Sequence, residues 1–202
     1  LFSYIIEVVY RPRSALAALV ADPAVAVYGV VGLTLLGLLY AFTTYVGYRR
    51  GFGAVATPWL NVAPERYYLY ETFFGTPVFL IVAVVFAGVA RLVAEAFGGS
   101  GTFEQMVGVY CLSSVAPMFV TLWVPETTLI VLFPDSRAKP LGGFGKLPTW
   151  IDVVRQLVSI GWPLVLVVIG LSLSEGLSTG AAIVSAAAGT VPSVALMLVF
   201  IR

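Results

Sequence analysis

The stretch from Gly75 to Trp123 reads GTPVFLIVAVVFAGVARLVAEAFGGSGTFEQMVGVYCLSSVAPMFVTLW and predicts two membrane-spanning helices joined by a short turn. Thr76-Pro77 has the pattern of a helix start, with a hydroxyl for the cap and proline in the first turn. The run from Pro77 to Phe97 corresponds to ~32 Å of helix, about the thickness of a bilayer core. A Gly-Gly-Ser-Gly turn ends it, and Thr102 with Gln105 forms a capping box that opens the next helix. The two helices are therefore expected to be antiparallel neighbours.

The composition of the whole chain agrees with a membrane location. Hydrophobic residues make up 60% of the 202 residues and charged residues only 10%, whereas soluble domains carry about 25%. A net charge of +1 leaves no basic stripe for a nucleic-acid partner. The chain has no histidine, which excludes imidazole metal sites and His-based catalytic triads. Its one cysteine, Cys111, lies in an apolar helix and is interpreted as a small core residue.

Five apolar segments predict an all-α polytopic bundle of five transmembrane helices. We expect the spans at about residues 23–48, 77–97, 103–123, 150–173 and 179–201. The fourth span is expected to kink near Pro163, and Ser178 or Thr179 caps the fifth. Thr149 with Asp152 has the spacing of a second capping box.

Three shorter segments lie outside these spans. Residues 1–22 are interpreted as an N-terminal amphipathic segment in the membrane interface, before a transmembrane domain at 23–202. An aromatic-rich helix from Pro64 is expected in the headgroup region. Pro125–Phe133 is too short to cross alone. It either extends the third helix beyond a kink or lies at the surface.

Several motifs resemble a known family. They are the Arg-Pro entry segment, the first span beginning at Asp-Pro, the stretch FGGSGTFEQMVGVYCLSSVAP and the closing WPLVLVVIGLSLSEGLSTGAAIVSA. From about Tyr10 onward the chain resembles the Yip family of Rab/Ypt-interacting integral membrane proteins, in particular its prokaryotic branch. The resemblance implies five spans and a membrane role without catalysis. The Asp-Leu-Tyr-Gly-Pro signature of eukaryotic members is absent, so a Rab-type GTPase is not the expected partner.

Arg91 is the charge placed deepest in a span, and it is the leading candidate for a binding residue. Arg91 and Glu95 are four residues apart and share a helix face. We expect Arg91 to pair first with Glu95 and second with Glu104, across the glycine turn. Such a pocket would contact a lipid phosphate or a protein partner. The alternative is that Arg91 and Glu95 simply snorkel to the interface.

The other polar residues have structural interpretations. Asp152 and Arg155 open the fourth span, Glu126 follows Pro125, and Glu175 lies in a turn that requires no special role. The sequence offers no catalytic, cofactor or metal-binding residues. Ser185 and Gly189 form a small-xxx-small face that predicts close packing of the fifth helix.

Three classes of function remain open. The leading one is a membrane adaptor or scaffold that organises protein partners, further copies of itself or bilayer shape. The second is a small transporter or channel subunit with proline-kinked helices, and the third is an enzyme acting on a membrane lipid. The positive-inside rule predicts that residues 49–66 and 134–149 are cytoplasmic loops of a prokaryotic cell membrane protein. Eukaryotic relatives, with a cytoplasmic N-terminus, imply the opposite orientation.

Overall fold

The computed structural model describes residues 1–54, 60–132 and 148–201, apart from the side chains of Thr149 and Asp152. Every regular element within these ranges is a helix. The elements are α1 (Phe2–Tyr10), α2 (Pro12–Ala21), α3 (Val25–Arg49), α4 (Pro64–Ala96), α5 (Phe103–Met118), the π-helix η1 (Phe119–Trp123), α6 (Val124–Leu132), α7 (Thr149–Glu175) and α8 (Thr179–Phe200). Five stretches are long and apolar enough to cross a membrane, which confirms the predicted five-span all-α class.

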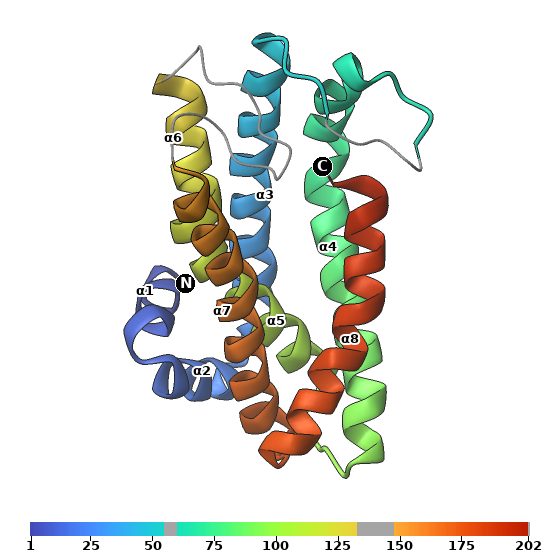
Figure 1. Cartoon of the computed structure of the whole chain (residues 1–202). Helices are drawn as coiled ribbons and strands as arrows, with labels where there is room; N and C mark the ends of the chain where they lie inside the picture. The colour runs from blue at the N-terminus through green and yellow to red at the C-terminus, as the bar shows by residue number, and fades with distance from the viewer. Residues whose placement is uncertain (55–59, 133–147, 202) are drawn as a thin grey trace.

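The spanning helices run alternately up and down, side by side (Figure 1). Two short connections, Gly98–Gly101 and Gly176–Ser178, lie at the same end of the bundle, which we call the turn end. We call the opposite end, where α3 and α8 finish and α4 and α7 begin, the loop end. The expected loop at 134–149 lies almost entirely outside the described residues.

The second span differs from the prediction because α4 is one continuous helix from Pro64 to Ala96, with Pro77 inside it. Thr76-Pro77 is therefore not a helix start, and the aromatic-rich segment is the first part of the span. Membrane helices tolerate an internal proline when neighbouring helices support the backbone. Helix α3 gives that support, because it packs closely against α4 on both sides of this position. A Cβ atom on Gly37 of α3 would lie 2.8 Å from Thr76 of α4, and one on Gly75 of α4 would lie 2.9 Å from the ring of Tyr40 of α3.

The third span extends beyond Trp123, where the sequence left two alternatives open. Its described part continues through η1 into α6 as far as Leu132, and these elements together form a single candidate span. Pro125 has no N–H, so the carbonyl of Thr121, four residues earlier, loses its helical donor. A π-turn at this place accommodates the missing hydrogen bond without ending the helix.

The N-terminal segment forms two short helices that pack against the flank of the bundle. Val8 of α1 and Leu16 and Leu19 of α2 are fully buried, and their cluster includes residues of α5 and α7 such as Leu112 and Leu166. The segment is thus part of the hydrophobic packing of the bundle. Its position in the membrane interface stays a prediction.

The helix starts follow the local sequence in most places. Both hydrogen bonds of the Thr102–Gln105 capping box are present, and Ser178 caps α8 by accepting from the N–H of Ala181. Helix α7 begins at Thr149, with Pro148 as its N-cap residue. The side chains of the predicted Thr149–Asp152 capping box lie outside the described part of the structure.

Candidate functional site

The first feature of interest within the bundle is a cluster of charges at the turn end. The guanidinium of Arg91 on α4 donates from Nη1 to both carboxylate oxygens of Glu175, at 3.0 and 2.9 Å. Its Nη2 lies 2.9 Å from Glu95 Oε1, one turn along the same helix. Arg91 therefore bridges α4 to the C-terminus of α7, and its predicted pairing with Glu95 is present.

Glu175 is the centre of this cluster, although its position in the sequence predicts only a turn residue without a special role. Its side chain is fully buried, and Oε2 also accepts a hydrogen bond from the N–H of Gly101 at 2.9 Å. A Cβ atom on Gly101 would lie 2.5 Å from the carbonyl oxygen of Ser174, and one on Gly99 would lie 2.6 Å from Glu175 Oε2. The glycines are thus needed because the turn closes directly on the carboxylate.

Glu104, the second predicted partner of Arg91, is exposed on the first turn of α5 and does not join the cluster. Arg91 with Glu95 and Glu175 carries a formal charge of −1, so the cluster is electrostatically unfavourable for an anion such as a phosphate. The sequence feature that could have identified Glu175 is its charge, which is opposite to that of Arg91, at the same end of the bundle. This feature predicts a contact only when it is known which helices are neighbours.

A second buried ion pair lies toward the loop end. Arg155 on α7 contacts Glu126 on α6, with Nη2 2.9 Å from Oε1 and both side chains almost completely buried. Arg155 Nη1 also donates to the carbonyls of Thr121 and Leu122 in η1, at 3.2 and 3.4 Å. The arginine thus binds the carbonyl that Pro125 leaves without its helical donor. The sequence interpretation of Arg155 and Glu126 as independent helix-start charges missed this pair.

Buried polar groups on α3, α4 and α6 lie near this pair along the bundle. Glu71 is completely buried, because α4 extends through the segment that the sequence placed among the headgroups. Thr43 shares a hydrogen bond with Thr127 at 2.5 Å, and Thr44 with Thr72 at 3.2 Å. These hydroxyl pairs link α3 to α6 and to α4.

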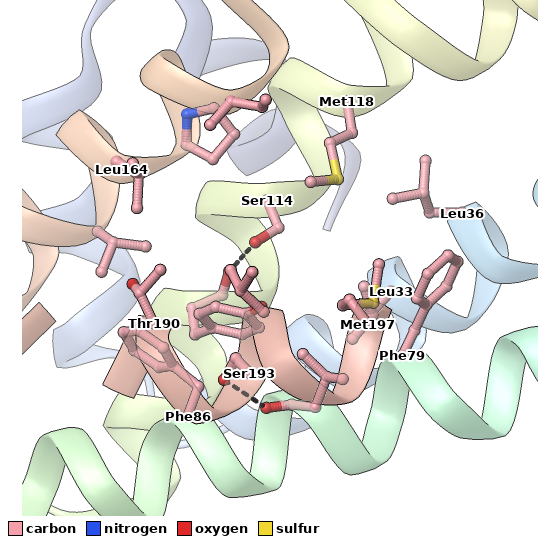
Figure 2. A pocket seen from close by; sticks show the side chains of 16 residues that line it. Leu33, Leu36, Phe79, Phe86, Ser114, Met118, Leu164, Thr190, Ser193 and Met197 are labelled. Atoms are coloured by element: carbon pink, nitrogen blue, oxygen red, sulfur yellow. Dashed lines mark hydrogen bonds between the residues drawn. The ribbon is translucent and has the colours of Figure 1, made fainter. Parts of the chain in front are cut away.

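The third feature is a cavity of about 270 Å³ lined by residues of α3, α4, α5, α7 and α8. Figure 2 shows its lining, with Leu33, Leu36 and Phe79 on one side and Leu164, Thr190 and Phe86 on the other. Apart from the Tyr110 phenol, its polar side chains are hydroxyls that donate to carbonyls of their own helices. These donors are Ser114 to Tyr110, Thr190 to Ala186 and Ser193 to Gly189.

The predicted packing residues of the fifth helix lie close to this cavity. Ser185 is fully buried. A Cβ atom on Gly189 would lie 2.9 Å from both the ring and the carbonyl oxygen of Phe86, and 3.0 Å from Ala90 Cβ. The backbone of α8 at Gly189 therefore packs directly against α4.

Metal or covalent chemistry finds little support in the described residues. The parts of the chain that the structure describes hold no group of three or more cysteine and acidic side chains suited to a metal ion. Cys111 is buried in the core of the bundle, among apolar side chains. The site of interest is thus the set of buried ion pairs and the apolar cavity between them.

These features define a polytopic α-helical membrane protein in which Arg91 is paired with Glu175, and Arg155 with Glu126, inside the bundle. The model of the Yip1 domain family matches residues 6–201, almost the whole chain. The chain therefore belongs to the Yip family, as its motifs indicated, and is an integral membrane protein of that family. No curated protein and no solved structure matches it.

Proposed function

We propose that this protein is a membrane adaptor or scaffold, which organises protein partners or bilayer shape in membrane traffic or homeostasis and catalyses no reaction. Membership of the Yip family supports this function. The observation that carries it is that buried charges pair between helices: Arg91 with Glu175, and Arg155 with Glu126. These ion pairs link the helices of the bundle, as a scaffold requires, and they do not line a transport pathway.

The partners in this proposal are the lipid bilayer and other membrane proteins or a second copy of the chain. Glu95 and Glu104 are exposed at the turn end and remain the proposed contact residues there, with Arg91 as the residue that positions Glu95. Because the cluster carries net negative charge, a basic segment of a partner suits it better than a lipid phosphate. A Rab-type GTPase and a nucleic acid are not among the proposed partners.

A photoreactive amino acid placed singly on different faces of the bundle tests the scaffold function in the native membrane. Val27 on α3, Phe73 on α4, Leu157 on α7 and Val191 on α8 are suitable because each is strongly exposed. A scaffold gives discrete protein adducts from neighbouring positions on one face and lipid adducts from the others. Lipid adducts alone from every face, in membranes from several growth conditions, would contradict the proposal.

The second candidate function is a small transporter or channel subunit. It is favoured by Pro77, Pro117, Pro163 and Pro192, which lie inside the spanning helices, and by the cavity in the bundle. Transported polar solutes require polar groups at mid-membrane, whereas this cavity is lined mainly by apolar side chains. Flux of ions and small solutes into reconstituted vesicles separates the two functions, since the scaffold predicts the same leak as protein-free vesicles.

A further inference from the structure

The cavity between the helices opens sideways, toward the lipid. Its inner wall is buried: Leu36 and Phe86 are 1% exposed and Val82 is 3% exposed. By contrast, three lining residues on α7 and α8 are open to the surroundings, namely Ile160 at 61%, Val194 at 47% and Leu164 at 38%. Helices α7 and α8 meet at the turn end and diverge from it (Figure 1). The mouth of the cavity therefore lies between α7 and α8.

The depth of the cavity places it near the middle of the bilayer. Pro163, Leu164 and Val167 lie close to the centre of α7, and Leu33 and Leu36 lie close to the centre of α3. A spanning helix of this kind is matched to a hydrocarbon core of about 30 Å. The surroundings of the mouth are thus the hydrocarbon interior and not the headgroups or water.

The wall chemistry selects an apolar occupant. The hydroxyls of Ser114, Thr190 and Ser193 already donate to backbone carbonyls, and water is held in a cavity only by two to four polar partners. Phe86 and Tyr110 stack with their ring centroids 4.2 Å apart and form one apolar surface. Met118 and Met197 also line the cavity, and methionine side chains adapt to a flexible apolar ligand.

We propose that this cavity binds the terminal part of one acyl chain of a bilayer phospholipid, which enters between α7 and α8. The bilayer interior supplies chain ends at this depth, and the mouth faces them directly. A volume of about 270 Å³ is just below the range of about 300–1,000 Å³ typical of pockets for whole drug-sized ligands. It fits a segment of one chain, while the glycerol and headgroup stay in the adjacent leaflet.

The occupied cavity would also complete the packing of the bundle. An empty space of this size leaves its lining side chains without contacts on one side, whereas close packing is the rule in protein interiors. A bound chain restores these contacts and keeps α7 and α8 apart at mid-depth. The proposal stands on the cavity alone and does not depend on the identity of any protein partner.

The test uses the full-length protein in vesicles of phosphatidylcholine and phosphatidylglycerol that contain a phospholipid with a diazirine at the end of one acyl chain. After illumination, peptide mass spectrometry compares labelling of Val82 and Phe86, which bulk lipid cannot reach, with that of Ile81, which is 55% exposed on the same helix. We expect carbene insertion at the buried wall as well as at Ile81. A probe with its diazirine in the headgroup should leave the buried wall unlabelled.

A variant pair identifies the route of entry. Val194→Trp places a large ring in the mouth, and Val191→Trp is its control, because Val191 is 71% exposed on the same helix and does not line the cavity. We expect Val194→Trp to lose labelling of Val82 and Phe86 and to keep that of Ile81, while Val191→Trp behaves as the wild type. If Val194→Trp does not fold, Val194→Phe serves the same purpose.

Two results would overturn the proposal. The first is labelling confined to exposed residues in the wild-type protein, which would mean that the cavity contains no chain end. The second is unchanged labelling of Val82 and Phe86 in the folded Val194→Trp variant, which would mean that the chain does not enter between α7 and α8.

Discussion

At the scale of single residues, the buried carboxylate of Glu175 joins the two turns of the turn end. It accepts two hydrogen bonds from Arg91 and one from the N–H of Gly101. Removing one partner of a buried ion pair leaves the other charge without compensation, which typically destabilises a protein by about 3–5 kcal/mol. The partly exposed pairing of Arg91 with Glu95 belongs to a class worth only about 0–1 kcal/mol.

We therefore expect Glu175→Gln to lower the unfolding free energy in detergent by about 3 kcal/mol, at the lower end of the range for broken buried pairs because the amide can still accept a hydrogen bond. The matched control is Glu95→Gln, on the same arginine, with an expected loss of about 1 kcal/mol or less. Unfolding monitored by circular dichroism in one detergent gives both values. Equal effects of the two substitutions would show that Glu175 is not the principal partner.

The turn glycines give a second prediction at this scale. Gly101→Ala would place a methyl group 2.5 Å from the carbonyl oxygen of Ser174, and overpacking of this kind costs about 1–3 kcal/mol. Gly180→Ala is the control, because a Cβ atom there meets no other atom within 4 Å. A melting temperature lowered by Gly101→Ala and unchanged or raised by Gly180→Ala is the expected result. The reverse order would contradict the tight closure of the turn on Glu175.

Residue-scale features were predictable only where they depend on one helix. The four-residue spacing of Arg91 and Glu95 predicted their contact, and that contact is present. Glu175, which approaches Arg91 from α7, and the pair of Glu126 with Arg155 depend on which helices are neighbours in space. The suggested role of Arg91, Glu95 and Glu104 in binding a partner stays a prediction.

At the scale of elements, the π-turn η1 and the arginine that contacts it form one unit. Pro125 withholds a donor from the carbonyl of Thr121, and Arg155 supplies one from α7 while it pairs with Glu126. Without Arg155, we expect the π-turn η1 to change its conformation and α6 to shift with it. The hydroxyl pair of Thr43 and Thr127 would then be misaligned.

We expect Arg155→Met to destabilise the protein by about 3–5 kcal/mol, because a buried ion pair and two hydrogen bonds to carbonyls are lost together. The double variant Arg155→Met/Glu126→Gln should recover part of this loss, since the carboxylate is no longer left without its arginine. A double-mutant cycle from unfolding in detergent measures the coupling. Strictly additive effects would contradict a direct Arg155–Glu126 interaction.

The contact of α8 with α4 gives a further prediction for elements. Gly189→Leu should disrupt folding or shorten the life of the folded state, because its side chain would collide with Phe86 and Ala90. Gly88→Leu on α4 is the control, since a Cβ atom at Gly88 meets no other atom within 4 Å. The midpoint temperature of aggregation in detergent compares the two. Equal stability of both variants would refute close packing at Gly189.

Apolar length and turn chemistry predicted the existence of the elements, and they failed at Pro77, which was interpreted as a helix start. At Pro125 they left two alternatives open, and the structure shows the one in which the third helix continues. In the bundle, close packing of α3 on α4 and the carbonyl contacts of Arg155 support the interrupted backbone. Continuity through Pro77 is also the reason why Glu71 is buried and not at the surface.

At the scale of the whole molecule, the ends of the bundle differ in ways that an orientation measurement can use. The loop end includes Arg49, Arg50 and Arg66, so the positive-inside rule predicts that this end faces the cytoplasm. Asn61 at the loop end and Ser100 at the turn end are exposed, and Cys111 is fully buried.

An impermeant thiol reagent applied to intact cells should therefore label Ser100→Cys and spare Asn61→Cys. Permeabilised cells, in which both variants react, are the control for accessibility. Labelling of Asn61→Cys alone would reverse the orientation and favour the cytoplasmic N-terminus of eukaryotic relatives.

The cavity between α7 and α8, which also belongs to this scale, was not predictable, because it depends on how five helices diverge and not on any one of them.

The mass of the particle released from the protein's own membrane tests the scaffold function most directly. Extraction into polymer-bounded native nanodiscs, followed by native mass spectrometry, keeps membrane partners together with their lipid. A scaffold predicts a reproducible species heavier than the single chain, with a second protein or further copies in fixed ratio. Release of the single chain with lipid alone, from membranes in which cross-linking before extraction also yields no larger species, would contradict the account.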